Sequence, residues 1–350
     1  TKKVKEISVR INGFEDCLKR VQRARRLWSE IGAKILQSNS PFEYKADIQN
    51  AIIALQEDLK KIKSPTIEFF LIFFKVELYQ INNSYDQAQL ILNNAISLLK
   101  NNPSIYTSER MAEVLINLAN NEITLGDYKG AISTSDQAMS IVESKTSNYL
   151  LFKEIKFFAC YYFKDIEMAE SLIKEIYYET LKFDIPFLKS KRAYLYASLK
   201  TIKGDIAASN ELLLQAKGLE KNKGGWNIAK RILSIINCVE ARDHEKVELL
   251  VGNLEKFVKR NARSNHVRKR DILILRILLK LINENYNFKK VYNSRRKQFQ
   301  LLEGNDPDYA WKIKSPELIV FHDWFKAKMA KQDRYLTAAK NQLSLAAEPR

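Results

Sequence analysis

The regular spacing of turn-forming residues limits the fold of this 350-residue chain more than any other feature. Between the turns, apolar side chains recur at i, i+3 and i+4 over roughly 12 to 20 residues, the pattern of a helix with one buried face. With only 10 Gly and 7 Pro, the chain is too poor in turn residues for an all-β sandwich or barrel. The spacing predicts a series of helical hairpins, with turns at Pro41, Ser64-Pro65, Asn101-Asn102-Pro103, Gly126-Asp127, Pro186, Gly204-Asp205, Lys223-Gly224-Gly225, Gly304-Asn305-Asp306-Pro307 and Ser315-Pro316.

The clearest hairpin begins at Ala112 and follows a known repeat pattern. Counted from Ala112 as position 1, small residues stand at positions 8, 20 and 27, and a Gly-Asp-aromatic turn stands at positions 15 to 17. These residues are Ala119, Ala131 and Ala138, with the turn at Gly126-Asp127-Tyr128. The pattern resembles the tetratricopeptide repeat (TPR) family, in which small residues let helices cross closely. The resemblance implies a stack of two-helix repeats, each burying its face on the next.

The same frame fits five further segments, whose starts are Phe69, Tyr149 or Leu150, Ser190, Ile228 and Ile272. We therefore expect an all-α fold, a right-handed superhelix (α-solenoid) of about six TPR-like helical hairpins with helical caps. The expected segments are an N-terminal helical cap at 1–64, a repeat solenoid at 65–305, and capping helices with a tail at 306–350. The first cap begins with a long helix, which Gly13 could interrupt.

Aromatic side chains are concentrated near the C-terminus, at Trp311, Phe321, Trp324 and Phe325. One interpretation is a terminal helix that seals the last hairpin, because an aromatic stripe usually packs in a core. The other is a docking segment for a partner or for a second copy of the chain, which would make a homodimer.

Composition argues against several classes of protein. The three cysteines, Cys17, Cys160 and Cys238, are widely separated and have no C-x-x-C spacing, so we expect neither disulfides nor a zinc site. No apolar run is long enough to span a membrane, and no signal-peptide pattern begins the chain, which favours a cytoplasmic protein. The sequence lacks the common nucleotide-binding, hydrolase and zinc-protease motifs. We therefore expect a protein that is not an enzyme and needs no metal or cofactor.

Positive charge is concentrated in two regions of the chain. Of the formal net charge of +17, residues 255–300 carry +11 and residues 1–30 carry +5. Stacked hairpins would bring basic residues of the segment 255–300 together on one surface as a basic stripe. Such a stripe would attract an acidic protein, a nucleic acid or an anionic membrane. A solvated surface with no partner is the alternative. The stripe residues are Lys256, Lys259, Arg260, Arg263, Arg268, Lys269, Arg270, Arg295, Arg296 and Lys297.

The resemblance to TPR proteins also implies a binding groove on the concave face, lined by the first helix of each hairpin. Residues at the matching positions are Phe73, Glu77, Ile116, Asn117, Asn120, Phe158, Tyr161, Lys191 and Tyr194. Asparagine amides can pair with peptide backbone, since they offer a donor and an acceptor together. Ordinary packing between helices is the alternative role for each of these residues.

The sequence predicts a non-catalytic scaffold or adaptor that binds a protein or peptide segment in this groove. The plan is also similar to the bacterial peptide receptors of the Rap/Rgg type, which implies a peptide-responsive regulator, and Lys-, Asn- and Ile-rich usage suits an AT-rich bacterial genome. A third alternative binds nucleic acid. Arg260 and His266 fit an R-x5-H spacing, which resembles the motif of HEPN-type ribonucleases. The neighbours His322 and Asp323 diverge by about 100° on a helix and are not expected to act as a catalytic pair.

Overall fold

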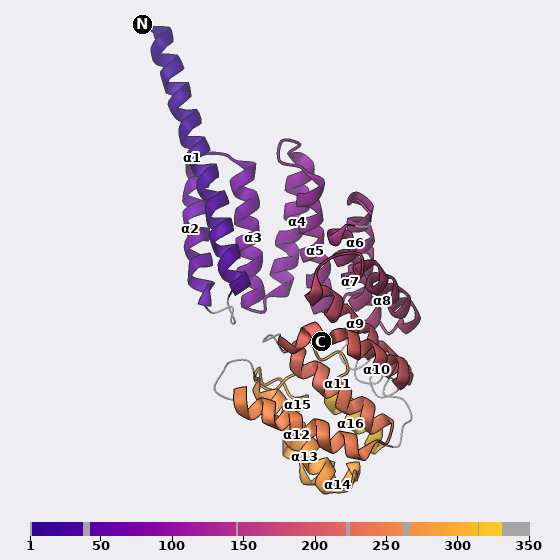
Figure 1. The fold of residues 1–350 in the computed structure, drawn as a ribbon. Coiled ribbons are helices and arrows are strands. Elements are labelled where there is room, and N and C mark those ends of the chain that lie inside the picture. Colours follow the sequence, from indigo (N-terminus) through magenta and orange to yellow (C-terminus); the bar gives the residue numbers. More distant parts are fainter. Residues whose placement is uncertain are drawn as a thin grey trace. The chain divides into compact units, whose positions relative to one another are not determined.

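The computed structural model describes residues 2–37, 43–144, 146–221, 225–261, 267–313 and 315–330, and Figure 1 traces them as helices joined by short loops. Within these ranges there is no strand, so the all-α class and the helical-repeat fold are confirmed. The chain divides into two compact units between Ala159 and Cys160, and each is described by itself. The three-segment division at residues 64 and 305 stays a prediction.

The first unit contains the helices up to the division, which falls inside α7. Its helices are α1 (Lys2–Gln37), α2 (Lys45–Lys61), α3 (Pro65–Ile81), α4 (Tyr85–Asn101), α5 (Ser108–Leu125), α6 (Tyr128–Ile141) and most of α7 (Ser147–Tyr162). The second unit contains α8 (Ile166–Thr180), α9 (Pro186–Ile202), α10 (Ile206–Gln215), a short 3-10 helix (Ala216–Lys221), α11 (Trp226–Glu240), α12 (His244–Asn261), α13 (Lys269–Asn283), α14 (Phe288–Ser294), α15 (Arg296–Glu303) and α16 (Phe321–Met329).

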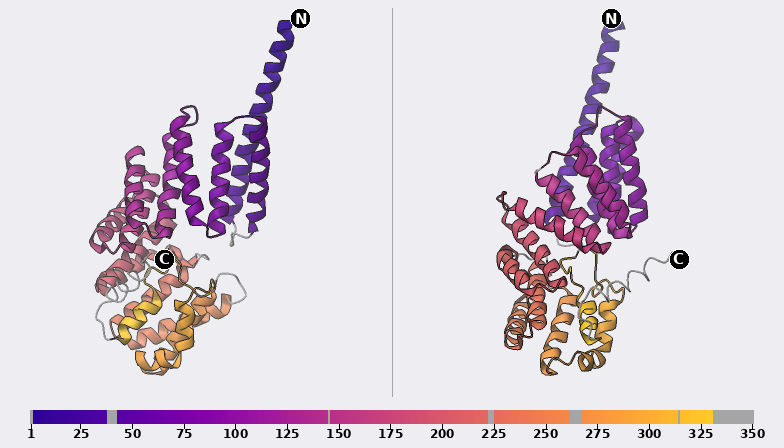
Figure 2. Two further views of the ribbon diagram at one scale, coloured as in Figure 1. Left: turned by 180° about the vertical axis from the view of Figure 1, so that it is seen from behind. Right: turned by 90° about the vertical axis from the view of Figure 1, so that its right-hand side faces the viewer.

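Helices α1, α2 and α3 form a bundle at the start of the first unit. Trp28 of α1 packs its ring against three phenylalanines of α3, with ring centroids 5.4 to 6.2 Å apart. Helix α1 is continuous through Gly13, so the possible break there is not present. Its N-terminal part extends beyond α2 and α3 (Figures 1 and 2) and exposes Ile11, Phe14 and Leu18 to solvent.

A short turn motif recurs between the two helices of the hairpins. A residue with positive φ is followed by a capping residue, as in Gly126-Asp127, Lys164-Asp165, Gly204-Asp205 and Arg242-Asp243. The cap's side-chain oxygen accepts a hydrogen bond from the N–H group three residues later, and its own N–H donates to the carbonyl five residues earlier. The two bonds satisfy groups at the end of one helix and the start of the next.

The small residues of the predicted repeat lie where the TPR pattern requires close packing. Ala119, Ala131 and Ala138 are completely buried, and Ala88 and Ala95 of the preceding hairpin are as well. Helix α5 packs on both α4 and α6, and the predicted turn lies between Leu125 and Tyr128. The hairpin interpretation of this region is confirmed.

The C-terminal aromatic residues lie in the core of the second unit. Phe325 of α16 packs against Phe288 and Phe299, with ring centroids 4.8 and 4.9 Å apart, and Phe321 and Trp324 are buried beside it. Helix α16 therefore seals the last helices, as the first interpretation predicted. The homodimer through these aromatic side chains is not supported, because the rings of α16 are buried in the core of their own unit.

Candidate functional site

A non-helical segment of the second unit, residues 315–320, lies on the first helices of its hairpins. We call it the C-terminal strap. The Tyr161 hydroxyl donates a hydrogen bond to the Leu318 carbonyl (2.8 Å), and the Tyr194 hydroxyl donates to the Pro316 carbonyl (2.7 Å). The Leu318 N–H also donates to the Pro316 carbonyl (3.1 Å), which closes a three-residue turn centred on Glu317. Two predicted groove tyrosines therefore hold the backbone of a turn.

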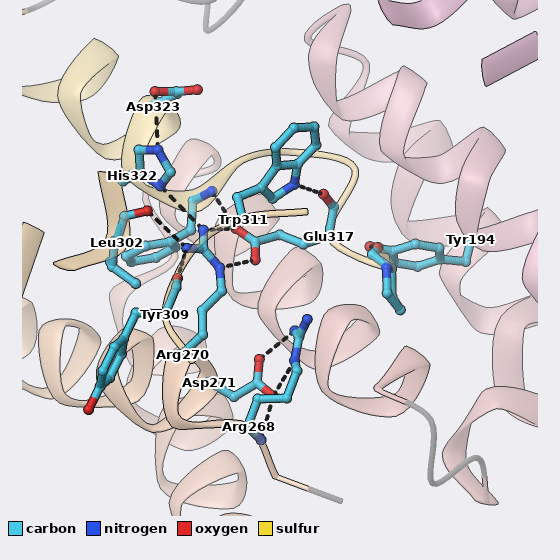
Figure 3. A network of polar contacts seen from close by, with 12 residues as sticks. Tyr194, Arg268, Arg270, Asp271, Leu302, Tyr309, Trp311, Glu317, His322 and Asp323 are labelled. Atoms are coloured by element: carbon cyan, nitrogen blue, oxygen red, sulfur yellow. Dashed lines mark hydrogen bonds and ion pairs between the residues drawn. The ribbon is translucent and has the colours of Figure 1, made fainter. Parts of the chain in front are cut away.

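The side chain at the centre of that turn is bound by a buried guanidinium (Figure 3). Arg270 of α13 is only 2% exposed, and its Nε and Nη2 atoms lie 2.7 and 2.8 Å from the two carboxylate oxygens of Glu317. The other three donors reach the carbonyls of Leu302 and Tyr309 and Nδ1 of His322. All five N–H groups of Arg270 thus have a partner, which is the arrangement that makes a buried charge tolerable.

Glu317 is held as a carboxylate by this surrounding charge. Burial alone would raise its pKa, but the hydrogen bonds and charge of Arg270 outweigh burial and lower it. The N–H of Phe321 also donates to Glu317 (2.8 Å), and the charge of Arg268 acts in the same direction. The Trp311 indole N–H donates to the Glu317 carbonyl (2.9 Å), so both the side chain and the backbone of this residue are bound.

His322 and Asp323 lie at the end of the same network. Burial and the charge of Arg270 lower the pKa of His322 to about 3, so the ring is neutral. Since a guanidinium only donates, Nδ1 of His322 is the acceptor and Nε2 carries the proton. Nε2 lies 3.7 Å from the carboxylate of Asp323, beyond hydrogen-bond distance. Burial raises the pKa of Asp323 to about 6. The pair is buried and belongs to the core.

The predicted groove residues of the first unit have mixed environments. Phe73 is buried in the core, and Phe158 is nearly buried, with its ring centroid 5.0 Å from that of Phe157. Glu77 is half-buried and accepts a hydrogen bond from Tyr44 (3.2 Å); burial raises its pKa. The α5 residues of the set, Ile116, Asn117 and Asn120, are half-buried and keep part of their surface in solvent.

The predicted groove residues of the second unit are already engaged. Tyr161 and Tyr194 are buried beneath the strap, and burial raises the pKa of the Tyr194 hydroxyl well above its usual range. Lys191 places its ammonium 5.3 Å from the ring centroid of Trp226. In this structure the two tyrosines bind the protein's own chain in place of an open groove.

The predicted basic stripe is reduced by pairing within the protein. Arg270 lies in the core and cannot contribute to a surface. Arg268 pairs with Asp271 at 2.6 Å, Lys269 with Asp308, and Lys259 with Glu255 at 2.9 Å. The remaining described members are exposed or half-exposed in two places, with Lys256 and Arg260 on α12 and Arg295, Arg296 and Lys297 at the junction of α14 and α15. Arg263 and His266 lie outside the described residues, and with them the proposed Arg260–His266 pair.

Sequence reasoning missed the Arg270–Glu317 pair, although one signal for it was present. Arg270, Ile274, Ile277 and Leu281 follow a spacing of four, three and four residues, which is the buried face of α13. An arginine on an apolar face implies a buried acidic partner. The identity of that partner has no local signal, because Glu317 is 47 residues away along the chain.

No family model matches the sequence, and no curated protein matches it. The solved structures that are similar in fold include two Rap proteins. A Rap protein in complex with competence and sporulation factor has a TM-score of 0.57 at 14% identity, covering 96% of this chain and 94% of that one. The apo form of RapI has a TM-score of 0.59 at 13% identity, covering 98% of each chain. At these identities the likeness shows a shared helical-repeat fold.

Among the described residues, no helix is long and apolar enough to cross a membrane.

Proposed function

We propose that this chain is a non-catalytic binding protein that holds a peptide or protein segment against the first helices of its hairpins. One observation carries the proposal: Tyr161 and Tyr194, on two such helices, bind the backbone carbonyls of a non-helical segment. Recognition through backbone carbonyls needs no particular side chain in the ligand, which suits a peptide-binding surface. The complex of a Rap protein with competence and sporulation factor supports a binding role for this architecture.

In the first unit, we assign the binding of an external segment to the face of α5 that carries Ile116, Asn117 and Asn120. Asn117 and Asn120 are half-buried there beside Ile116, so amide groups stand next to an apolar contact. Asn117 is oriented by its own helix, since its Nδ2 donates to the Glu113 carbonyl at 2.8 Å. A fixed amide presents hydrogen-bonding groups to a peptide backbone at a low cost in side-chain entropy.

The exposed basic residues of the second unit favour an acidic partner. Lys256, Arg260, Arg296 and Lys297 are exposed, and clustered positive charge accelerates the association of acidic molecules in a salt-dependent way. A peptide-responsive regulator, the first alternative from the sequence, is one form that this binding role would take, and it stays a prediction.

The proposal is tested by capturing partners from lysate of the source organism with three versions of the chain. The wild type and the control Gln137→Ala, an exposed residue of α6, should recover the same protein after nuclease treatment. The variant Asn117→Ala/Asn120→Ala should bind the partner about thirtyfold more weakly and recover correspondingly less of it, because two hydrogen bonds of about 1 kcal/mol each are lost. Loss of every partner on nuclease treatment would refute the proposal in favour of nucleic acid, and equal recovery by all three versions would refute the α5 site.

A further inference from the structure

The strap is bound in the way that a protein binds a separate peptide. Two of its carbonyls accept hydrogen bonds from the hydroxyl groups of Tyr161 and Tyr194. Its central carboxylate is bound by the fully buried guanidinium of Arg270. Figure 3 shows Glu317 pointing away from Tyr194 and into the guanidinium. The contacts therefore specify three features of a ligand: two carbonyls, a turn between them, and one carboxylate.

Packing beneath the strap is incomplete on one side. A small cavity lies between the strap, α9 and α11, lined by Tyr194, Ala229, Ile232, Leu233, Ile236, Glu317 and Ile319. Protein interiors are normally filled to crystal-like density, so this cavity marks a place where the contact between the strap and the helices is incomplete. The helix that follows has an anchor of its own, since Phe325 packs against Phe288 and Phe299, and its link to the strap is the hydrogen bond from the Phe321 N–H to Glu317. Release of the strap would break this bond but not the aromatic contacts of α16.

We propose that the face formed by Tyr161, Tyr194 and Arg270 is a recognition site for a peptide turn with a central glutamate between proline and aliphatic residues. The strap, Ser-Pro-Glu-Leu-Ile-Val, is its resident occupant, and an external segment of the same chemistry binds by exchanging with it. This inference rests on the proposed function and adds a ligand chemistry and a means of regulation. The charge of the site selects the acid, because a bidentate pair between arginine and carboxylate is stronger and more directional than a neutral contact.

Exchange is strongly biased toward the resident strap. A segment joined to its site by short chain behaves as though it were present at an effective concentration of the order of millimolar or higher. An external peptide at micromolar concentration therefore does not displace the strap of the wild type. It binds once the strap is weakened, either by substitution or by a partner that holds the displaced strap.

The test uses the full chain and a fluorescein-labelled, end-blocked synthetic peptide of residues 311–320, with fluorescence anisotropy as the readout. Glu317→Ala in the chain removes the carboxylate from the strap and leaves the residues Tyr161, Tyr194 and Arg270 themselves unchanged. We expect this variant to bind the peptide at least about tenfold more tightly than the wild type does. Glu167→Ala, which also removes one acidic group but lies at an exposed ion pair with Lys203, should bind as weakly as the wild type.

Two further comparisons make the outcome specific to the site. A peptide with alanine in place of its glutamate should not bind the Glu317→Ala chain, and adding Tyr194→Phe to that chain should weaken binding of the original peptide. If Glu317→Ala fails to fold by circular dichroism, Leu318→Ala is used, because it leaves the Arg270 pair in place and removes only apolar contact.

Three results would overturn the inference: equal peptide binding by wild type and strap variants, equal binding of the two peptides, or no effect of Tyr194→Phe. These results are separable from failure of the proposed function, because partner capture depends on Asn117 and Asn120 of the first unit. If the α5 variant loses its partner in the capture experiment but the peptide does not bind the strap variants, the proposed function holds and the strap site is refuted.

Discussion

His322 and Asp323 should have opposite effects on the pH dependence of stability, so that in the wild type the effect of each largely offsets the effect of the other. The pKa of His322 falls from 6.5 to about 3 on folding. The folded protein then binds fewer protons than the unfolded chain below pH 6.5, and stability is lost as the pH falls. The pKa of Asp323 rises from 3.8 to about 6. There the folded protein binds more protons between pH 6 and 4, and stability is gained as the pH falls.

The size of each effect follows from 1.36 kcal/mol per pKa unit. Between pH 7 and pH 5, His322 costs about 2 kcal/mol, because pH 5 lies about 1.5 units below its unfolded pKa. Over the same interval Asp323 contributes about 1.4 kcal/mol, because pH 5 lies about one unit below its folded pKa. In the wild type the two terms nearly cancel, and the variants Asp323→Asn and His322→Gln uncover them one at a time.

Chemical unfolding followed by tryptophan fluorescence measures the effect, since Trp324 is buried beside both residues. Relative to wild type, Asp323→Asn should lose about 1.4 kcal/mol more stability between pH 7 and pH 5, and His322→Gln should lose about 2 kcal/mol less. Each comparison with wild type cancels the titration of all other groups. Parallel curves for the three proteins over this interval would refute the assigned protonation states, even if the variants differ in absolute stability.

Three further predictions concern the buried pair, two glycines and a helix cap. Arg270→Met should destabilise the second unit by about 3 to 5 kcal/mol because it leaves Glu317 buried and unpaired, and Arg270→Met/Glu317→Leu should recover most of this in a thermal melt. Gly126→Ala should cost about 1 kcal/mol, since Gly126 has φ of +83°, whereas Gly252→Ala, inside α12 with open space around it, should stabilise by about 0.5 to 1 kcal/mol. Asp127→Ala should cost about 1 kcal/mol in chemical unfolding through loss of the α6 cap.

The hairpins could be predicted from the sequence because the signals for their turns are local. Asp127, Asp165, Asp205 and Asp243 each cap the second helix of a hairpin, and the oxygen and the N–H group that it binds are only three residues apart. Glycine was a less complete guide, because Lys164 and Arg242 also adopt positive φ at two of these turns. The aspartate cap is therefore the more constant part of the turn signal. The residue before it has positive φ at every one of these turns, but it is not always glycine.

The state of the candidate site could not be predicted, because it depends on contacts between residues far apart in the chain. TPR spacing placed Tyr161 and Tyr194 on a groove-facing side, but their hydroxyls bind carbonyls 157 and 122 residues away. No periodicity reports whether a distant segment returns to cover a helix face. The same long-range folding removes Arg270 from the surface, so a count of charge along the sequence overstates the positive surface around 255–300. Local pattern thus predicts which helix faces are candidates for binding, and the long-range contacts of Pro316 and Leu318 show that one of them is covered by the protein's own chain.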